Sequence, residues 1–144
     1  MISTEGAVFA QWGVPTIEDM DRVARALREA ATKAGRPVIY ITRVPAQAPP
    51  PDAKVRQHLD TLMPEIVEAC SSYHVVMEGD GFFAAMKRAV LLGIFQIRWR
   101  RGVFFVHSTM AELREETALA DRTAVASVLA SAERAGLLSS HPRG

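Results

Sequence analysis

Short apolar runs alternate with longer amphipathic segments along this chain of 144 residues. The apolar runs are rich in β-branched and aromatic side chains, which is typical of strands. The predicted strands cover residues 7–12, 37–42, 73–78 and 103–106. In the second run, Val38 to Ile41 are all apolar or aromatic, which predicts a central strand with helices over it.

The segments between these runs have apolar residues at helical spacing. The first should form a helix that begins after Thr16, whose hydroxyl can cap it, and ends at Gly35. The other helices are predicted over 55–70, over 82–95, from Thr109 to Leu119, and from the cap Asp121 to Gly136. In the first of these, Pro64 should introduce a kink, and Ser71 and Ser72 should close the helix.

Two connections are distinctive in composition. Four prolines lie between Pro45 and Pro51, so residues 44–52 should form a stiff loop that joins neither a helix nor a sheet. The turn Gly79-Asp80-Gly81 precedes a helix, where backbone amides could hold a phosphate or carboxylate. We favour the alternative, a tight turn with Asp80 as helix cap, because Ala84 stands where the dinucleotide-binding fingerprint has its last glycine.

Strands that alternate with helices indicate βαβ units with right-handed crossovers. The sequence therefore predicts an α/β fold with a mostly parallel or mixed sheet of four to five strands, packed with helices. No repeat or long linker divides the chain. We assign residues 1–120 to one α/β domain and residues 121–144 to a C-terminal helical extension of the same domain.

This order of elements resembles the STAS-like fold of bacterial anti-sigma factor antagonists and related STAS/SEC14-like proteins. The resemblance covers residues 7–120, and the segments 73–82 (YHVVMEGDGF) and 103–108 (VFFVHS) carry it. It implies a compact regulatory domain that docks to another protein. Antagonists of this family carry a phosphorylated serine or threonine after the second central strand, but the matching stretch, 46–55, has no hydroxyl residue. No phosphorylation site is therefore carried over.

Composition and charge narrow the function classes. The chain is 49% hydrophobic and 23% charged, as in average soluble proteins, which excludes disorder. A net charge of +1 gives no general attraction to nucleic acid or anionic membranes. The longest apolar stretch, 89–95, is far shorter than the roughly 20 residues that span a bilayer. One cysteine and no segment like a signal peptide lead us to expect a cytoplasmic protein.

The reactive side chains form no familiar catalytic or metal-binding pattern. Cys70, His58, His74 and His107 form no pair at Cys-x-x-Cys or His-x-x-x-His spacing, so we expect no structural metal and no cofactor. We interpret Cys70 as a small buried hydrophobe. His107 ends a predicted strand, where α/β proteins bind ligands, but we favour a surface position for it. Without a nucleophile, a base and a stabilising donor together, we expect no enzyme.

We therefore expect a non-catalytic regulatory or scaffolding module that binds another protein. The arginines 98–101 with Trp99 could meet an acidic partner, or could instead pair with Glu112, Glu115 or Glu116. One side of the apolar helix 82–95 could pack against a second copy in a homodimer. The predicted partner contacts are Pro49, Pro50, Asp52, Asp80, Phe82, Phe83, Arg98, Trp99, Arg100 and Arg101. The alternative is a small-ligand or lipid-binding module, with an apolar pocket lined by Phe82, Phe83, Trp99 and Phe104.

Overall fold

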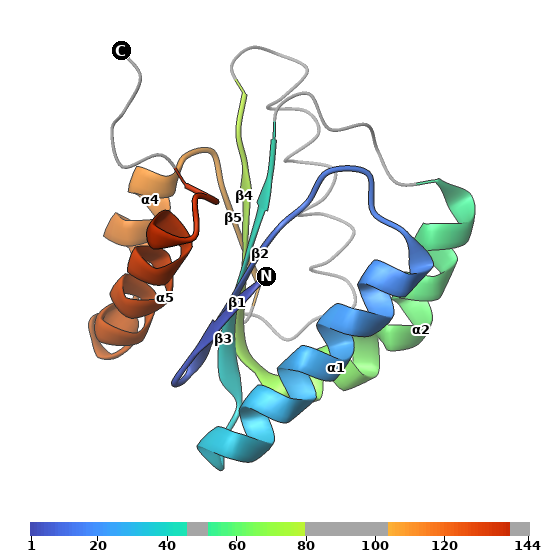
Figure 1. Ribbon diagram of the computed structural model, residues 1–144, viewed down its shortest axis with the longest axis horizontal. Helices are drawn as coiled ribbons and strands as arrows, with labels where there is room; N and C mark the ends of the chain where they lie inside the picture. Colours follow the sequence, from blue (N-terminus) through green and yellow to red (C-terminus); the bar gives the residue numbers. More distant parts are fainter. Residues whose placement is uncertain (46–51, 80–103, 139–144) are drawn as a thin grey trace.

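A computed structural model describes residues 1–45, 52–79 and 104–138 of the chain. These residues form an α/β fold around a five-stranded sheet in the order β1-β2-β3-β4-β5 (Figure 1). The strands are β1 (Ile2–Thr4), β2 (Ala7–Gln11), β3 (Val38–Val44), β4 (Cys70–Met77) and β5 (Phe104–His107). Strands β2 to β5 are parallel and β1 is antiparallel to β2, so the sheet is mixed and β3 is central, as the sequence predicts.

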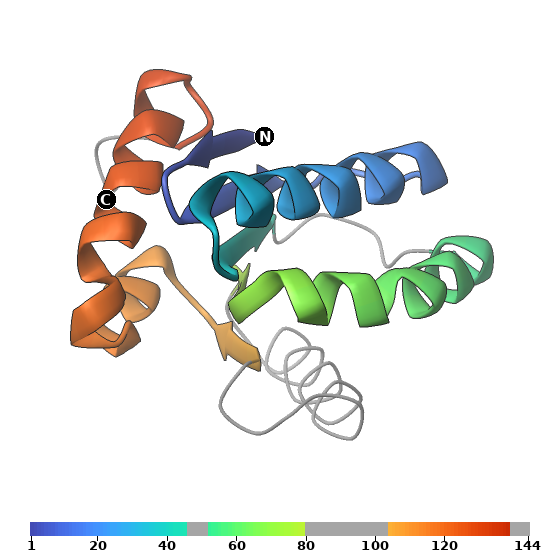
Figure 2. The ribbon, with the colours of Figure 1, turned by 90° about the horizontal axis from the view of Figure 1, so that it is seen from below.

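Helices cover both faces of the sheet. The helices α1 (Ile17–Ala34) and α2 (Ala53–Ala69) lie side by side on one face, as Figure 2 shows. The helices α4 (Met110–Glu116) and α5 (Arg122–Arg134), joined by the short 3-10 helix η1 (Leu119–Asp121), lie on the other face. The connection through α1 leads from β2 to its neighbour β3, and the connection through α2 leads from β3 to its neighbour β4, so both advance across the sheet in the same direction. Right-handed crossovers of this kind place α1 and α2 on a single face.

Alternating side chains of the strands supply two separate hydrophobic cores. Val8 and Tyr40 point into the core beneath α1 and α2. Their neighbours Phe9 and Ile41 point into the core beneath α4 and α5, where Leu129 is fully buried. Both faces of the central strands are covered, which explains why the sequence of β3 is apolar without alternation.

Local signals in the sequence set the ends of α1. The Thr16 hydroxyl accepts a hydrogen bond from the Asp19 backbone N–H, and the Asp19 carboxylate accepts one from the Thr16 N–H. This capping box satisfies two amides that the first helical turn leaves free. Gly35 ends the helix in the left-handed conformation, with φ of 68°. The structure thus confirms the helix predicted between Thr16 and Gly35.

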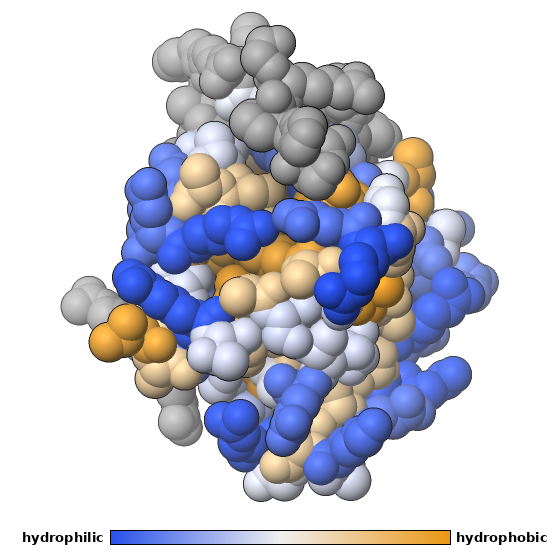
Figure 3. All heavy atoms as spheres, turned by 60° about the vertical axis from the view of Figure 1, so that its left-hand side comes forward, coloured by the Kyte–Doolittle hydropathy of each residue, from blue (hydrophilic) through white to orange (hydrophobic). Residues whose placement is uncertain are grey.

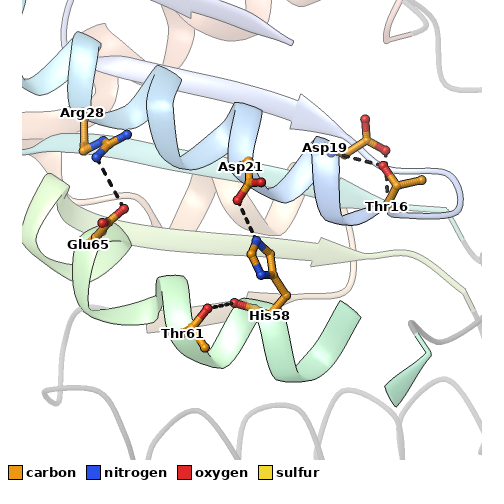
Figure 4. Close-up of polar contacts among 7 residues, drawn as sticks. All are labelled: Thr16, Asp19, Asp21, Arg28, His58, Thr61 and Glu65. Atoms are coloured by element: carbon orange, nitrogen blue, oxygen red, sulfur yellow. Dashed lines mark hydrogen bonds and ion pairs between the residues drawn. The ribbon is translucent and has the colours of Figure 1, made fainter. Parts of the chain in front are cut away.

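Polar contacts on the outer side connect α1 to α2, as Figure 4 shows. His58 Nε2 lies 2.6 Å from the Asp21 carboxylate, and Arg28 lies 3.7 Å from Glu65. His58, one of the reactive side chains considered above, is therefore engaged in a contact between two helices.

The structure corrects two boundaries predicted from sequence. Val44 belongs to β3, where it pairs with Met77, and not to the proline loop. Ser71 and Ser72 do not close the second helix but belong to β4, because α2 ends at Ala69. Pro64 lies inside α2, which continues past it.

Two further predictions concern the C-terminal helices. Thr109 caps α4, as predicted, but the helix ends at Glu116, and Leu119 lies in η1 with 79% of its surface exposed. Asp121 precedes α5 without making a side-chain capping hydrogen bond. Gly136 follows α5 with φ of 77°, as expected of a residue that ends a helix.

The sequence pattern did not predict β1. It forms a hairpin with β2 in which Thr4 pairs with Ala7, so the turn consists of Glu5 and Gly6. Gly6 has φ of 85°, a conformation that glycine adopts without strain. Its carbonyl also accepts a hydrogen bond from Ile39 in β3, which fixes the turn against the sheet.

Candidate functional site

Three connections leave the sheet side by side at the carboxyl ends of β2, β3 and β4. The Trp12 backbone N–H, just after β2, donates to the Arg43 carbonyl at 3.0 Å. The Glu78 N–H, just after β4, donates to the Val44 carbonyl at 3.3 Å. These bonds extend the parallel pairing beyond the regular strands. The edge of the sheet is therefore held together where the chain departs into its connections.

A charged pair crosses the same edge. The Arg43 guanidinium donates two hydrogen bonds, each 2.8 Å long, to the two carboxylate oxygens of Glu78. It also donates to the Gln11 side chain at 3.4 Å. The hydrogen bonds that Arg43 donates to the Glu78 carboxylate raise the pKa of Arg43 above its ordinary value. Bidentate pairing fixes both side chains, so the edge presents an ordered polar surface.

Apolar side chains are exposed in the connection from β2 to the start of α1. Val14 lies between Gly13 and Pro15 and is 70% exposed, and Ile17 at the start of α1 is 37% exposed. A large apolar side chain held in water on a short loop is suited to contact another molecule. The sequence analysis did not single out Val14.

Of the predicted partner contacts, only Asp52 lies within the described residues. Its carboxylate caps α2 by accepting a hydrogen bond of 2.9 Å from the Val55 N–H, and it is exposed. The remaining nine lie outside the described residues: Pro49, Pro50, Asp80, Phe82, Phe83, Arg98, Trp99, Arg100 and Arg101. Of the alternative apolar pocket, only Phe104 is described. It is 6% exposed and packs in the core against Tyr73.

A second polar group lies on the opposite face of the sheet from α1 and α2. His74 in β4 and His107 in β5 are 5% and 1% exposed. His74 Nδ1 lies 2.9 Å from His107 Nε2, and His74 Nε2 lies 3.1 Å from the Ser72 hydroxyl. The ring of Phe105 stacks on His74 with centroids 4.9 Å apart. Ser72, His74 and His107 thus form a continuous buried chain of hydrogen bonds.

Two carboxylates of α4 lie beside the His107 end of this chain. Glu112 and Glu116 are four residues apart and share one side of the helix. Glu116 Oε2 lies 2.8 Å from His107 Nδ1, and the side chain of Glu116 is 58% exposed. One ligand atom from each of His107, Glu112 and Glu116 lies within 4.8 Å of the others.

The surroundings of the two rings favour neutral imidazoles. Burial, with a smaller contribution from the neighbouring His107, lowers the pKa of His74 to about 4. Burial also lowers the pKa of His107, although the negative charges of Glu116 and Glu112 oppose this effect. A hydrogen bond from Ser108 lowers the pKa of Glu112, whose carboxylate accepts from the Ser108 N–H at 2.6 Å. At neutral pH the group therefore combines neutral imidazoles with an ionised carboxylate.

The sequence analysis was wrong about His107, for which it favoured a surface position. His107 ends β5, which pairs with β4, the strand that contains His74. The helix α4 packs against both strands, so His107 is buried. The prediction for Cys70 is confirmed: it is 6% exposed within the core, and burial raises the pKa of its thiol to about 12.

One sequence signal could have identified the second group. A histidine at the carboxyl end of a strand, followed by two glutamates at helical spacing in the next helix, brings three ligand atoms to one place. Histidine and cysteine spacing alone does not reveal this group, and in the sequence Glu112 and Glu116 stand out only as possible partners for arginine. In the described residues they face His107 instead.

Comparison with known proteins identifies no relative: no protein-family model, curated protein or solved structure matches this chain. Among the described helices, none is both long and apolar enough to cross a membrane. The resemblance to STAS-like domains therefore stays a prediction, beside the α/β fold that the structure shows.

Proposed function

We propose that this chain is a non-catalytic regulatory module of the STAS-like kind that binds another protein through the carboxyl edge of its sheet. The observation that carries this proposal is that the carboxyl ends of β2, β3 and β4, from which three connections start, lie side by side at that edge. Backbone hydrogen bonds from Trp12 to Arg43 and from Glu78 to Val44 hold their starting points together. The proline loop begins after β3, and the segment with the predicted aromatic and basic contacts begins after β4.

The described part of this edge has features of a protein-binding surface. Val14 offers an exposed apolar contact, while Arg43 and Glu78 offer hydrogen-bonding groups that are already ordered. Val14 should lose little conformational freedom when a partner binds, because its loop is short and Pro15 restricts the backbone. A partner would gain apolar contact in the centre and polar contacts around it.

The burial of the reactive side chains supports binding rather than turnover. Cys70 and Ser72, which could serve as nucleophiles, are 6% and 7% exposed. The strand order also advances steadily from β2 to β5, so the described sheet has no point at which the order reverses. In open α/β sheets, such reversals create the crevice where small ligands bind.

The proposal is tested with a charge placed on the exposed apolar residue. Tagged wild-type protein and a Val14→Asp variant are incubated with lysate from the native cell, and bound proteins are quantified by mass spectrometry. We expect a specific protein to bind the wild type and to be depleted about tenfold or more with Val14→Asp, since a charge at the centre of an interface is costly.

The matched control is Leu119→Asp. Leu119 is 79% exposed in η1, between α4 and α5, and the turn there lies at the far end of these helices from the carboxyl edge (Figure 1). The partner should bind this variant as it binds the wild type. Equal loss with both variants, or no loss with Val14→Asp, would contradict the proposed surface. Both variants should keep the wild-type circular dichroism spectrum.

A further inference from the structure

We propose that His107, Glu112 and Glu116 bind one divalent transition-metal ion of the Zn²⁺ class. This inference goes beyond the proposed function, since it concerns the face of the sheet that carries α4 and α5, and it does not depend on any protein partner. It rests on the arrangement of the three side chains and on the hydrogen bonding of His107.

The spacing of the ligand atoms suits a common ion. One ligand atom from each of the three residues lies within 4.8 Å of the other two. Ligand atoms that are bound to zinc at about 2.1 Å lie roughly 3 to 3.5 Å from one another in ordinary coordination geometries. The 2.8 Å between His107 Nδ1 and Glu116 Oε2 is close to that range. Rotation of the exposed Glu116 side chain, with Glu112 half-buried and held by the Ser108 N–H, would bring the three ligand atoms closer to the spacing that an ion requires.

The second, independent observation is the state of His107 Nδ1. This nitrogen is fully buried and makes no hydrogen bond with any described residue, although Glu116 Oε2 is 2.8 Å away. The carboxylate oxygen therefore lies near the nitrogen without accepting a well-aligned bond from it. Buried polar atoms are almost always satisfied, so a buried ring nitrogen without a well-aligned hydrogen bond, beside two carboxylates, favours a cation as the group that all three bind.

The other side of the His107 ring is already fixed. Metal-binding histidines usually give their second ring N–H to a hydrogen-bond acceptor, which orients the ring. Here His107 Nε2 is 2.9 Å from His74 Nδ1, and His74 Nε2 is 3.1 Å from the Ser72 hydroxyl. With a cation on Nδ1, His107 donates from Nε2 to His74, and His74 donates in turn to Ser72. His74 then acts as a positioning residue for the metal ligand.

The ligand set and its exposure indicate the class of ion. An imidazole nitrogen with two carboxylates suits zinc and neighbouring transition metals better than Mg²⁺ or Ca²⁺, which prefer oxygen ligands alone. His107 forms the buried base of the group, and Glu116 is 58% exposed. Figure 3 shows the side of the molecule that carries α4 and α5, where hydrophilic and apolar residues are mixed, and the exposure of Glu116 gives an ion access from water.

The test is the binding of Zn²⁺ alone to the full chain, measured by competition with a chromophoric zinc indicator at neutral pH. We expect one zinc ion per chain. Glu112→Gln and Glu116→Gln should each weaken the affinity about tenfold or more, because an amide replaces an anionic ligand. Glu112→Gln keeps an oxygen that can accept from the Ser108 N–H, so α4 should remain folded. Addition of Zn²⁺ should also shift the ¹⁵N resonance of His107 Nδ1 in the wild type.

Two matched controls distinguish this group from chance binding. Glu115→Gln removes an exposed carboxylate from the same helix, and His58→Gln removes the partner of Asp21 on the opposite face of the sheet. Both variants should bind zinc with wild-type affinity. The inference is overturned if the wild type binds no zinc, if both glutamate variants at 112 and 116 bind it unchanged, or if His58→Gln abolishes binding. Because Glu116 is exposed, its variant tests the ligand set even if Glu112→Gln proves unstable.

Discussion

Burial controls the chemistry of Cys70. Burial raises the pKa of its thiol to about 12, and only the thiolate attacks alkylating reagents. We predict that native protein at pH 8 reacts with iodoacetamide about a thousandfold more slowly than an ordinary cysteine, and that urea-unfolded protein reacts at the ordinary rate. Intact-mass spectrometry after timed quenching measures both rates. Fast labelling of the native protein would show that Cys70 is accessible.

The buried histidines should make the fold sensitive to acid. The folded pKa of His74 is about 4, whereas an unfolded histidine titrates near pH 6.5. Between these two pH values His74 is protonated in the unfolded chain but not in the folded chain. The free energy of unfolding therefore falls as pH drops from about 6.5 to about 4. The loss from His74 alone should be about 3 kcal/mol, and His107, whose pKa is lowered too, adds to it in the same direction.

Urea unfolding between pH 7 and pH 4.5, with a chelator present, measures this effect. The comparison is between wild type and His74→Gln, which keeps an amide able to hydrogen-bond but does not titrate. The variant should lose less stability over this range, whatever its stability at pH 7. Parallel pH profiles for the two proteins would contradict the assignment of the proton to His74.

Helix caps depend on residues within one turn, and the sequence predicts those of α1 and α4 correctly, although Asp121 makes no side-chain capping hydrogen bond at the start of α5. Thr16 with Asp19, and Thr109 with the Glu112 backbone, are found as the sequence pattern indicates. Strand limits are less local. Whether Ser71 and Ser72 belong to a helix or to β4 depends on how β4 pairs with β3. That pairing joins residues about 30 positions apart, so the local sequence does not predict it.

Two variants of Asp52 can distinguish its role as the cap of α2 from its predicted role as a partner contact. Its carboxylate accepts from the Val55 N–H, so Asp52→Ala should lower the free energy of unfolding by about 1 kcal/mol, while Asp52→Asn should preserve it because asparagine caps equally well. Urea denaturation measures the stability of both variants. If Asp52 also meets a partner through its charge, both variants should weaken capture of that partner. A stable Asp52→Asn that binds normally would restrict Asp52 to its capping role.

At the scale of the whole molecule, alternation of apolar runs and amphipathic helices was sufficient to predict the α/β fold and the central position of β3. The candidate sites were harder to predict because they depend on which strand ends become neighbours. His74 and His107 are 33 residues apart in sequence yet form a hydrogen bond across β4 and β5. Similarly, Val14 is a candidate contact because it follows β2, whose carboxyl end lies beside those of β3 and β4. Neither relation can be obtained from spacing along one element.

The C-terminal helix is an integral part of the domain, which can be tested with two leucines close together in sequence. Leu129 of α5 is fully buried in the core between α5 and the sheet, whereas Leu119 is 79% exposed. Leu129→Ala should therefore lower the free energy of unfolding by about 2–5 kcal/mol, and Leu119→Ala should change it by less than about 0.5 kcal/mol. Because α5 closes the second core, fluorescence of Trp12, which packs against the first core, should follow the same unfolding curve as circular dichroism in every variant. The chain also contains Trp99, so the variants are made in a Trp99→Phe background. A separate, earlier loss of helical signal would show instead that residues 121–144 fold independently of the sheet.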